Sequence, residues 1–326
     1  MSKVQSIQVG ADENDTRLDR WIKRRMPGLG QGKIEKALRK GDIRVDGKKA
    51  KANFRLLTGM EVRLPPFDVS VPKLPTRPMV NAKDSALVKS MVIFEDQNMF
   101  ALNKPSGLAV QGGTGTPRHI DGMLPALSDG EHIPKLVHRL DRDTSGLLVL
   151  GRNPNATASL AKAFKSRKAE KTYLAIVLGN PRPEQGTIKG YMKKGMGPKE
   201  REQMVWGRHG EREAQYSRTL YTVVSGAGQK AALVALRPET GRTHQLRFHL
   251  AEIGYAISGD HKYVCDRDPL GGLPDQLMLH AWSLTLPSPS GGTFSQICPL
   301  PPHFKQAMDM LGFESSIPQN LFEAME

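Results

Sequence analysis

The chain has 326 residues, enough for about two domains of ~150 residues each. Its 38% hydrophobic and 25% charged residues exclude global disorder, two cysteines are too few for a disulfide framework, and no apolar run approaches the ~18 residues that would span a membrane. The net charge of +14, from 47 basic and 33 acidic residues, favours a polyanionic partner and above all a nucleic acid.

The first 75 residues contain a small module with readable local structure. Residues 1–15 lack the apolar run of a signal peptide, so we expect a flexible N-terminus on a cytoplasmic protein. In residues 16–75, apolar residues at i, i+3 and i+4 predict two short helices, the second ending at Gly41. Asp46-Gly47 then predicts a hairpin, and alternating apolar residues from Met60 predict a further strand.

This module holds most of the excess charge. From Thr16 to Lys73 there are 16 basic and 6 acidic residues, which is ten of the fourteen net charges. A solvated basic surface that binds nothing specific is the alternative, but such concentration favours a nucleic-acid-binding module. Five prolines between Pro65 and Pro78 then predict an extended linker, with 76–90 as its second part.

Residues 91–326 are predicted to form a second, larger domain. Apolar strand patterns at 147–152, 172–179 and 233–238 mix with single helices after Asn153-Pro154 and through the HQLRFHLAEIG segment. Because strands and helices do not alternate regularly, we expect an α+β fold with a mixed, largely antiparallel sheet. The tail LGFESSIPQNLFEAME carries no interpretable pattern.

Three polar clusters stand next to predicted apolar strands. They are LVHRLDRDTSGLLVL, with His138, Arg139, Asp141, Arg142 and Asp143; RPETGRTHQLRFH, with Arg242, His244, Gln245, Arg247 and His249; and EKTY, with Tyr173. A carboxylate flanked by arginines marks either a salt-bridged loop or a site of chemistry. The second cluster is equally compatible with a basic surface facing RNA, and Tyr173 with ordinary packing.

Cofactor and metal motifs do not match. Gly32-Lys33 fails the phosphate-loop pattern, the glycines at 112–115 lack dinucleotide-binding spacing, and Asp143 stands where a nucleophile elbow requires glycine. The histidines do not pair with cysteines at zinc spacing. We therefore expect neither a cofactor nor a metal.

The HRLDRDTSG segment closely resembles the catalytic motif of the RluA family of pseudouridine synthases. Five further segments resemble the family's other motifs in the same order: NKPSGLAV, EKTYLAIVLG, TGRTHQLRFH, ISGDHKY and LMLHAWSLTLPSP. The basic module resembles the S4 RNA-binding domain, and together the matches cover about residues 16 to 303. GLAVQGG and parts of the S4 region are most similar to the RluC branch, which acts on large-subunit ribosomal RNA, whereas the charged, Gly-rich segment 191–213 departs from the family.

The resemblance implies a domain order and a set of functional residues. It implies an S4 domain at 16–75 and a synthase domain at 91–326, with Asp141 as the essential carboxylate, Arg247 as the arginine paired with it, and Tyr173 as the aromatic that stacks on the target uracil. Arg139 matches the residue that enters the gap left by the extruded nucleotide. Whether Asp141 attacks C1′, attacks the base or removes the 2′ proton stays open, and Asp143 is left out of the catalytic set.

The implied partner is ribosomal RNA, with no membrane and no obligate protein partner. Phosphate contacts are expected from Arg39, Lys40, Lys48 and Lys49, which lie at the end of the second helix and on the hairpin. Three alternatives remain: the same chemistry on transfer RNA or on uridines of the RluD branch, a catalytically silent S4-type ribosome-assembly factor, and a glycosylase that releases free uracil.

Overall fold

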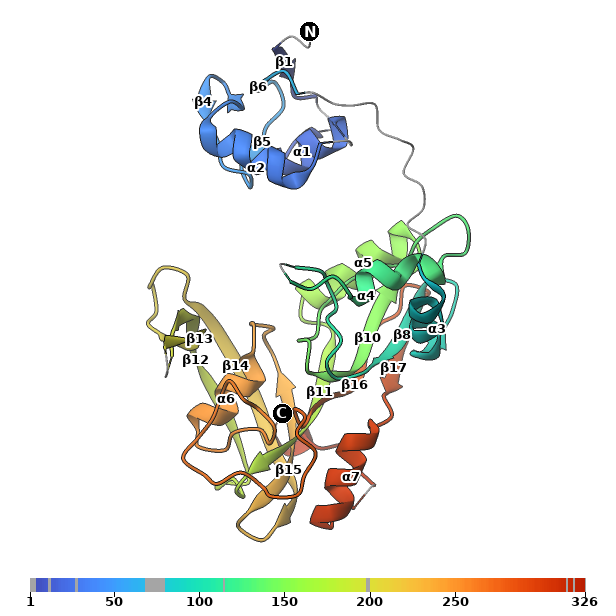
Figure 1. The fold of residues 1–326 in the computed structure, drawn as a ribbon, viewed down its shortest axis with the longest axis vertical. Coiled ribbons are helices and arrows are strands. Elements are labelled where there is room, and N and C mark those ends of the chain that lie inside the picture. Colours follow the sequence, from blue (N-terminus) through green and yellow to red (C-terminus); the bar gives the residue numbers. More distant parts are fainter. Residues whose placement is uncertain are drawn as a thin grey trace. The chain divides into compact units, whose positions relative to one another are not determined.

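The computed structural model describes residues 4–10, 13–26, 29–67, 80–113, 115–197, 200–314, 316–318 and 320–325. The chain divides into two compact units, Met1–Met79 and Val80–Glu326, and each is described by itself (Figure 1). Within the described ranges, no helix is both long and apolar enough to cross a membrane.

The first unit combines two helices with short strands. Its elements are β1 (Gln5–Gln8), β2 (Thr16–Arg17), α1 (Leu18–Arg25), α2 (Gln31–Lys40), β3 (Arg44–Val45), β4 (Lys48–Lys49), β5 (Arg55–Leu56) and β6 (Glu61–Leu64). One sheet has the order β1-β6-β3-β4, and β2 pairs with β5. The apolar faces of α1 and α2 meet the sheet in a core that includes Trp21, Ile34 and Val62.

Local sequence signals account for most of this unit. Gly41 caps α2 in the left-handed conformation, and Asp46 and Gly47 both adopt positive φ angles, 46° and 74°, as the two-residue turn between β3 and β4 requires. The prediction that residues 1–15 are flexible is wrong for the strand β1, which pairs antiparallel with β6, and for Val9, which is buried. With a single apolar residue, β1 carries almost no periodic signal, and its pairing with the distant β6 determines its structure.

The second unit is built on an eleven-stranded sheet. Its strands are β7 (Val92–Glu95), β8 (Met99–Lys104), β9 (Lys135–Leu136), β10 (Ser145–Gly151), β11 (Glu170–Leu178), β12 (Gln185–Met196), β13 (Glu202–Gly207), β14 (Gln215–Ala227), β15 (Ala231–Pro238), β16 (Leu279–Pro287) and β17 (Thr293–Ile297). Its helices are α3 (Ala82–Ser90), α4 (Ile120–Met123), α5 (Pro154–Lys165), α6 (Gln245–Glu252) and α7 (Pro302–Leu311), with two 3₁₀ turns at Leu124–Leu127 and Glu323–Met325.

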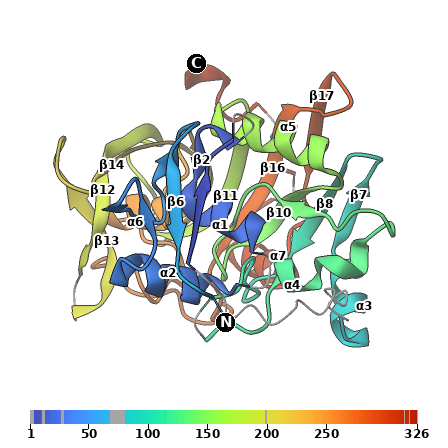
Figure 2. The ribbon, with the colours of Figure 1, turned by 90° about the horizontal axis from the view of Figure 1, so that it is seen from above.

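The strand order explains how distant segments meet. It runs β13-β12-β14-β15-β11-β16-β10-β8-β7, with β17 on β16 and β9 on β10, and Figure 2 shows this span from the β12–β13 hairpin to β7. Among the described strands only β10 and β16 pair in parallel, so the mixed, largely antiparallel sheet is confirmed. At the start of β10, Gly146 has a φ of 110°, and a Cβ there would lie 2.3 Å from the Ala281 carbonyl oxygen, so glycine permits the parallel contact.

The boundary between linker and second unit differs from the prediction. Of the predicted linker 76–90, residues 76–79 lie outside the described residues, and 82–90 form α3, which is a helix of the second unit. The Asn81 side chain accepts a hydrogen bond from the Asp84 amide as an N-cap, and Val88 is buried. The predicted start at residue 91 is therefore too late, because the proline-rich signal ends before the cap of α3.

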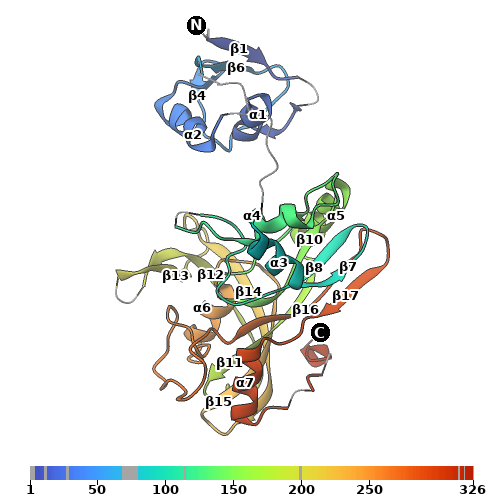
Figure 3. The ribbon, with the colours of Figure 1, turned by 45° about the vertical axis from the view of Figure 1, so that its right-hand side comes forward.

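Two hydrophobic cores lie in the second unit, one around β11, β14, β15, α6 and α7 and the other around β8, β10, α4 and α5. Tyr173 of β11 packs against both. The C-terminal tail adds Phe313 and Phe322 to the first core. The β12–β13 hairpin projects from one end of the sheet (Figure 3). The junction of the two cores is where the polar clusters of the sequence meet.

Candidate active site

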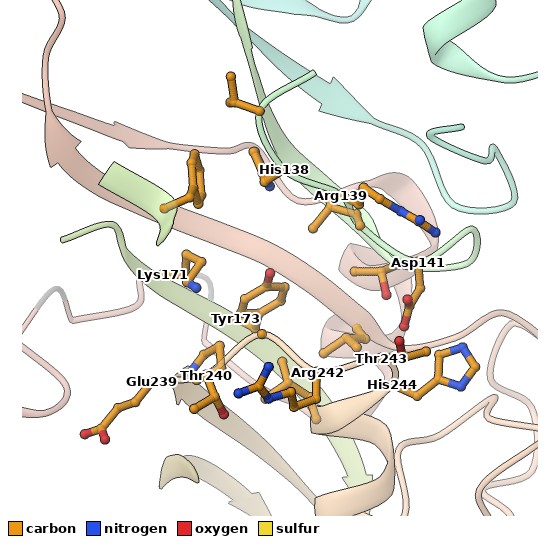
Figure 4. A pocket seen from close by; sticks show the side chains of 18 of the residues that line it. His138, Arg139, Asp141, Lys171, Tyr173, Glu239, Thr240, Arg242, Thr243 and His244 are labelled. Atoms are coloured by element: carbon orange, nitrogen blue, oxygen red, sulfur yellow. The ribbon is translucent and has the colours of Figure 1, made fainter. Parts of the chain in front are cut away.

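A pocket of about 820 Å³ lies at the junction of the two cores. It is lined by the loop between β9 and β10, the end of α5, the start of β11, and residues 238–247 between β15 and α6 (Figure 4). All three polar clusters predicted from the sequence therefore contribute to one cavity. Its volume is in the range of pockets that hold a compact ligand such as a nucleotide.

The loop that carries Asp141 is fixed by hydrogen bonds from a buried lysine. Lys104, at the end of β8, is fully buried, and its Nζ donates hydrogen bonds of 2.8 Å to the carbonyl oxygens of Pro105, Leu108 and Arg142. Burial lowers the pKa of Lys104 to about 7, and the negative charges of Asp143 and Asp141 oppose that shift. A buried cation thus fixes the main chain directly after Asp141.

Further bonds secure both ends of this loop. The Ser106 hydroxyl donates to the Asp143 carbonyl at 2.7 Å, and Ser145 Oγ lies 2.9 Å from His280 Nδ1. At the other end, His138 Nε2 accepts a 2.9 Å hydrogen bond from the Val149 amide and is therefore neutral, consistent with a pKa lowered by burial to about 3. The carboxylate thus stands on a fixed backbone, as chemistry at a defined atom requires.

Asp141 and Tyr173 face the same cavity from a loop and a strand that are far apart in the sequence. Asp141 is partly exposed in the loop before β10, whereas Tyr173 lies on β11, two strands away across β16. The register of β11 and β16 shifts at Thr172/Tyr173, a bulge of the kind that re-aims a side chain. Burial first, and the nearby Asp141 charge second, raise the pKa of Tyr173, so its hydroxyl stays protonated.

Arg247 lies in the pocket, but its two-pronged hydrogen bond goes to a different partner from the one predicted. Its Nε and Nη2 donate to the two carboxylate oxygens of Asp260, each at 2.7 Å, and the side chains are 9% and 0% exposed. Asp141 is close enough for its charge to raise the pKa of Arg247, so the two groups still interact electrostatically. The predicted fork to Asp141 is wrong, because both prongs of the Arg247 guanidinium bind the buried carboxylate of Asp260 and neutralise it.

A second set of contacts surrounds the Arg247–Asp260 pair. Asp260 also accepts hydrogen bonds from the amides of Lys262 and Tyr263. The guanidinium of Arg247 lies 5.3 Å from the centre of the Tyr263 ring, and the Tyr263 hydroxyl lies 2.9 Å from His244 Nδ1. The segment ISGDHKY thus holds two residues of the pocket lining in place, Arg247 through Asp260 and His244 through Tyr263.

The remaining predicted residues are exposed cations. Arg139 stands beside Asp141 at the pocket and is solvent-exposed, and the end of α5 adds the exposed Lys165 and Arg167 to the same lining. The four predicted RNA contacts Arg39, Lys40, Lys48 and Lys49 belong to the Met1–Met79 unit, where all are exposed at the end of α2 and on β4.

Sequence reasoning did not assign roles to Lys104, Asp260 or Tyr263, although all three stand in segments that matched the family motifs. The sequence did contain a signal for two of them, because Lys104 and Asp260 are charged residues directly beside apolar segments, where a charge is seldom buried without a partner. Within the described residues, no three His, Cys, Asp or Glu side chains gather as the ligands of a metal ion would.

Comparisons with known proteins agree with this arrangement. A family model described as RNA pseudouridylate synthase matches residues 98–252, and an S4 domain model matches residues 16–62. A Rickettsia bellii protein named Ribosomal large subunit pseudouridine synthase C is 37% identical over 276 residues, 83% of this chain and 89% of that protein. A Salmonella typhi protein of the same name is 32% identical over 315 residues, 94% of this chain and 97% of that protein.

Solved structures give the same result. Human RNA Pseudouridylate Synthase Domain Containing 4 matches with a TM-score of 0.60 and 30% identity, covering 71% of this chain and 98% of that chain. Human RNA Pseudouridylate Synthase Domain Containing 1 matches with a TM-score of 0.56 and 25% identity, covering 72% and 92%. With its catalytic-type pocket in the second unit and an S4 domain in the first, the chain belongs to the RNA pseudouridylate synthase family.

Proposed function

We propose that this protein converts uridines of large-subunit ribosomal RNA to pseudouridine, with Asp141 as the catalytic carboxylate. The single observation that carries the assignment of Asp141 is its place in the pocket, on a loop locked by Lys104 and opposite the ring of Tyr173. The choice of large-subunit ribosomal RNA is supported by the names of the relatives that match over most of the chain. Work on this substrate would take place in the cytoplasm.

The reaction is an isomerisation that needs no donor group. The N1–C1′ bond of uridine breaks, the uracil turns, and a C5–C1′ bond forms while the hydrogen on C5 is lost and N1 gains one. A carboxylate can serve such glycosidic chemistry as a nucleophile or as a base. The pocket encloses the base between these steps, which prevents the release of free uracil.

Each surrounding residue has a role that follows from its environment. The neutral phenol of Tyr173 offers a flat face for the uracil and a hydroxyl donor, while Arg247, anchored by Asp260, supplies positive charge near Asp141. Chemistry on a base requires its extrusion from the helix, and the exposed guanidinium of Arg139 can replace the lost stacking. The exposed cations of the S4 domain would bind phosphates and position the RNA.

The test is pseudouridine mapping of ribosomal RNA by carbodiimide modification, with and without the gene, and with the gene encoding Asp141→Asn. Each pseudouridine modified by carbodiimide stops reverse transcription. We expect specific stops in large-subunit ribosomal RNA to disappear without the gene and to remain absent with the variant. Loss of modification in transfer RNA instead would change the substrate, and an unchanged map in all RNAs would favour the silent S4-type factor. Release of free uracil in vitro would identify a glycosylase.

A further inference from the structure

His244 faces the pocket from an unusual backbone position. It precedes α6 with a φ of 52°, in the left-handed region that a residue other than glycine seldom occupies. Its carbonyl still accepts the helical hydrogen bond from the Phe248 amide, but its side chain caps no amide of the helix. Backbone strain of this kind persists where surrounding contacts impose it, and it is frequent at functional sites.

The contact that holds the His244 side chain begins on the β12–β13 hairpin. The main-chain amide of Met204, on β13, donates a 3.0 Å hydrogen bond to the Tyr263 hydroxyl, which lies 2.9 Å from His244 Nδ1. Of the two partners that the structure describes for this hydroxyl, the Met204 amide can only donate and Nδ1 is able to accept, so we assign the hydroxyl hydrogen to Nδ1. His244 Nδ1 is therefore the acceptor, and its proton is carried on Nε2.

The charges around His244 favour this neutral form. Burial lowers its pKa, Arg247 and Lys262 lower it further, and Asp141 and Asp260 act in the opposite direction. Tyr263 is itself buried and keeps its proton, because burial raises its pKa to about 12. A protonated Tyr263 and a neutral His244 together give the relay from Met204 one direction.

His244 and Asp141 line the same pocket. Asp141, Thr243 and His244 gather at that end in Figure 4, and Asp141 is among the charges that His244 senses. The fork of Arg247 is committed to Asp260 and cannot orient Asp141 through two hydrogen bonds. A separate neutral donor could supply that orientation, and His244 is the neutral nitrogen donor beside the carboxylate in this lining.

We propose that His244 is a positioning residue whose Nε2–H donates to the Asp141 carboxylate, in a tautomer set by the relay from the β13 main chain through Tyr263. The inference rests on the proposed function for the catalytic role of Asp141; the tautomer of His244 and its hydrogen bonds do not depend on that role. It links the hairpin to the pocket, because the amide of Met204 reaches Tyr263 only while β13 stays docked.

A buried hydrogen-bond chain next to the relay keeps the hairpin and α6 in register. Gln245 donates to Thr219, whose hydroxyl lies 3.0 Å from His249 Nδ1; His249 Nε2 lies 2.9 Å from Ser217 Oγ, and Ser217 donates to the Gly190 carbonyl of β12. Each hydroxyl in this chain accepts one hydrogen bond and donates one. The helix that begins at Gln245 is thereby tied to the strand that carries the hairpin.

The tautomer can be measured without turnover. Histidine ¹⁵N shifts of the full-length protein should show His244 with a protonated Nε2 and an unprotonated Nδ1. Tyr263→Phe keeps the ring and removes the hydroxyl, so it should abolish this pattern. The matched control is Tyr255→Phe, because the Tyr255 hydroxyl also accepts a main-chain hydrogen bond, from Arg182, whereas the hydroxyl partner of His244 is Tyr263. A wild-type His244 protonated on Nδ1, or on both nitrogens, overturns the relay.

Single-turnover tritium release from RNA that contains 5-tritiated uridine tests the positioning role. His244→Ala should slow the step by about 10²-fold while RNA affinity stays within about threefold, as for loss of one oriented donor. His244→Gln restores a nitrogen donor near the Nε2 position and should recover most of the rate. A His244→Ala rate within threefold of wild type, or no recovery with glutamine, overturns the proposal. If the wild-type protein modifies no RNA, the proposed function fails, and the ¹⁵N measurement alone decides the relay.

Discussion

The two units of this protein use charged and polar residues in opposite ways. In Val80–Glu326, Lys104, Arg247 and His280 are buried and bonded to specific partners, whereas the described part of Met1–Met79 buries only Glu13 and Asp19 among its polar residues. The first unit keeps its many cations on the surface. The second unit therefore depends on specific contacts between buried groups, whereas the first depends on the number of its exposed cations.

This contrast has an energetic meaning. A buried charge that loses its partner costs several kcal/mol, so a substitution in a buried pair of the second unit should have a large effect by itself. Exposed cations each contribute about 1 kcal/mol or less, act almost additively and weaken with salt. The following experiments test that division, beginning with the largest expected effect.

Replacing Asp141 by Asn should reduce tritium release at least about 10⁴-fold, as expected for a group that takes part in bond making. RNA affinity should stay within about twofold, because the amide keeps the size of the carboxyl group. The control is Asp143→Asn, since that side chain is 47% exposed and contacts Arg142 outside the pocket lining. Equal activity of the two variants would remove Asp141 from the mechanism.

Replacing Arg247 by Lys should reduce turnover about 10²-fold, because lysine keeps the charge and loses the planar fork that binds Asp260. Arg25→Lys is the matched control, since Arg25 forms a similar fork with Glu13 in the first unit. Turnover of that variant at saturating RNA should stay within about twofold. Similar losses in both variants would show that general stability, and not the pocket, explains the effect.

Acid should destabilise the second unit first. Burial lowers the pKa values of His249 and His280 to about 4, so the unfolded chain binds protons on them from about pH 6.5 downward while the folded chain does not. Stability is complete above pH 6.5 and falls by about 3 kcal/mol per histidine as the pH approaches 4. The first unit contains no histidine, and Arg25 holds the pKa of Glu13 at about 2. The stability that Glu13 contributes to this unit is therefore lost only below the ordinary glutamate pKa of 4.5.

Tryptophan fluorescence can follow the two units separately. A Trp21→Phe variant reports the second unit through Trp206 and Trp282, and the variant lacking those two reports the first unit through Trp21. Thermal unfolding between pH 7.5 and 4.5 should show a falling midpoint in the first variant and a nearly constant one in the second. The opposite order would show that the buried histidines do not control acid stability.

The smallest effect is expected from the S4 domain. Lys48→Ala combined with Lys49→Ala should weaken RNA binding and reduce the slope of log affinity against log salt by about 1.4–1.8, while turnover at saturating RNA persists. Lys305→Ala, an exposed lysine on α7 away from the pocket lining, is the control and should leave the slope unchanged. An unchanged slope in the double variant would remove the β4 lysines from the RNA contact.

Local patterns predicted much of the fold. The periodicities at Leu18–Ile22 and Ile34–Leu38, the Asp46-Gly47 turn and the Asn153-Pro154 start of α5 are confirmed, because each depends on neighbours within one or two turns of chain. The predictions failed for β1 and α3, where pairing with β6 or the burial of Val88 outweighs a weak local signal.

The candidate site divides along the same line. The sequence by itself indicated the candidate catalytic residues, because Asp141, Tyr173 and Arg247 stand in ordered motifs beside apolar strands. Only the tertiary structure decided their partners: the fork of Arg247 on Asp260, the three carbonyls on Lys104, and the relay from Met204 to His244. These contacts join segments far apart in the chain. They form because each buried charge and hydrogen-bonding group needs a partner, and no local sequence pattern encodes which partner that is.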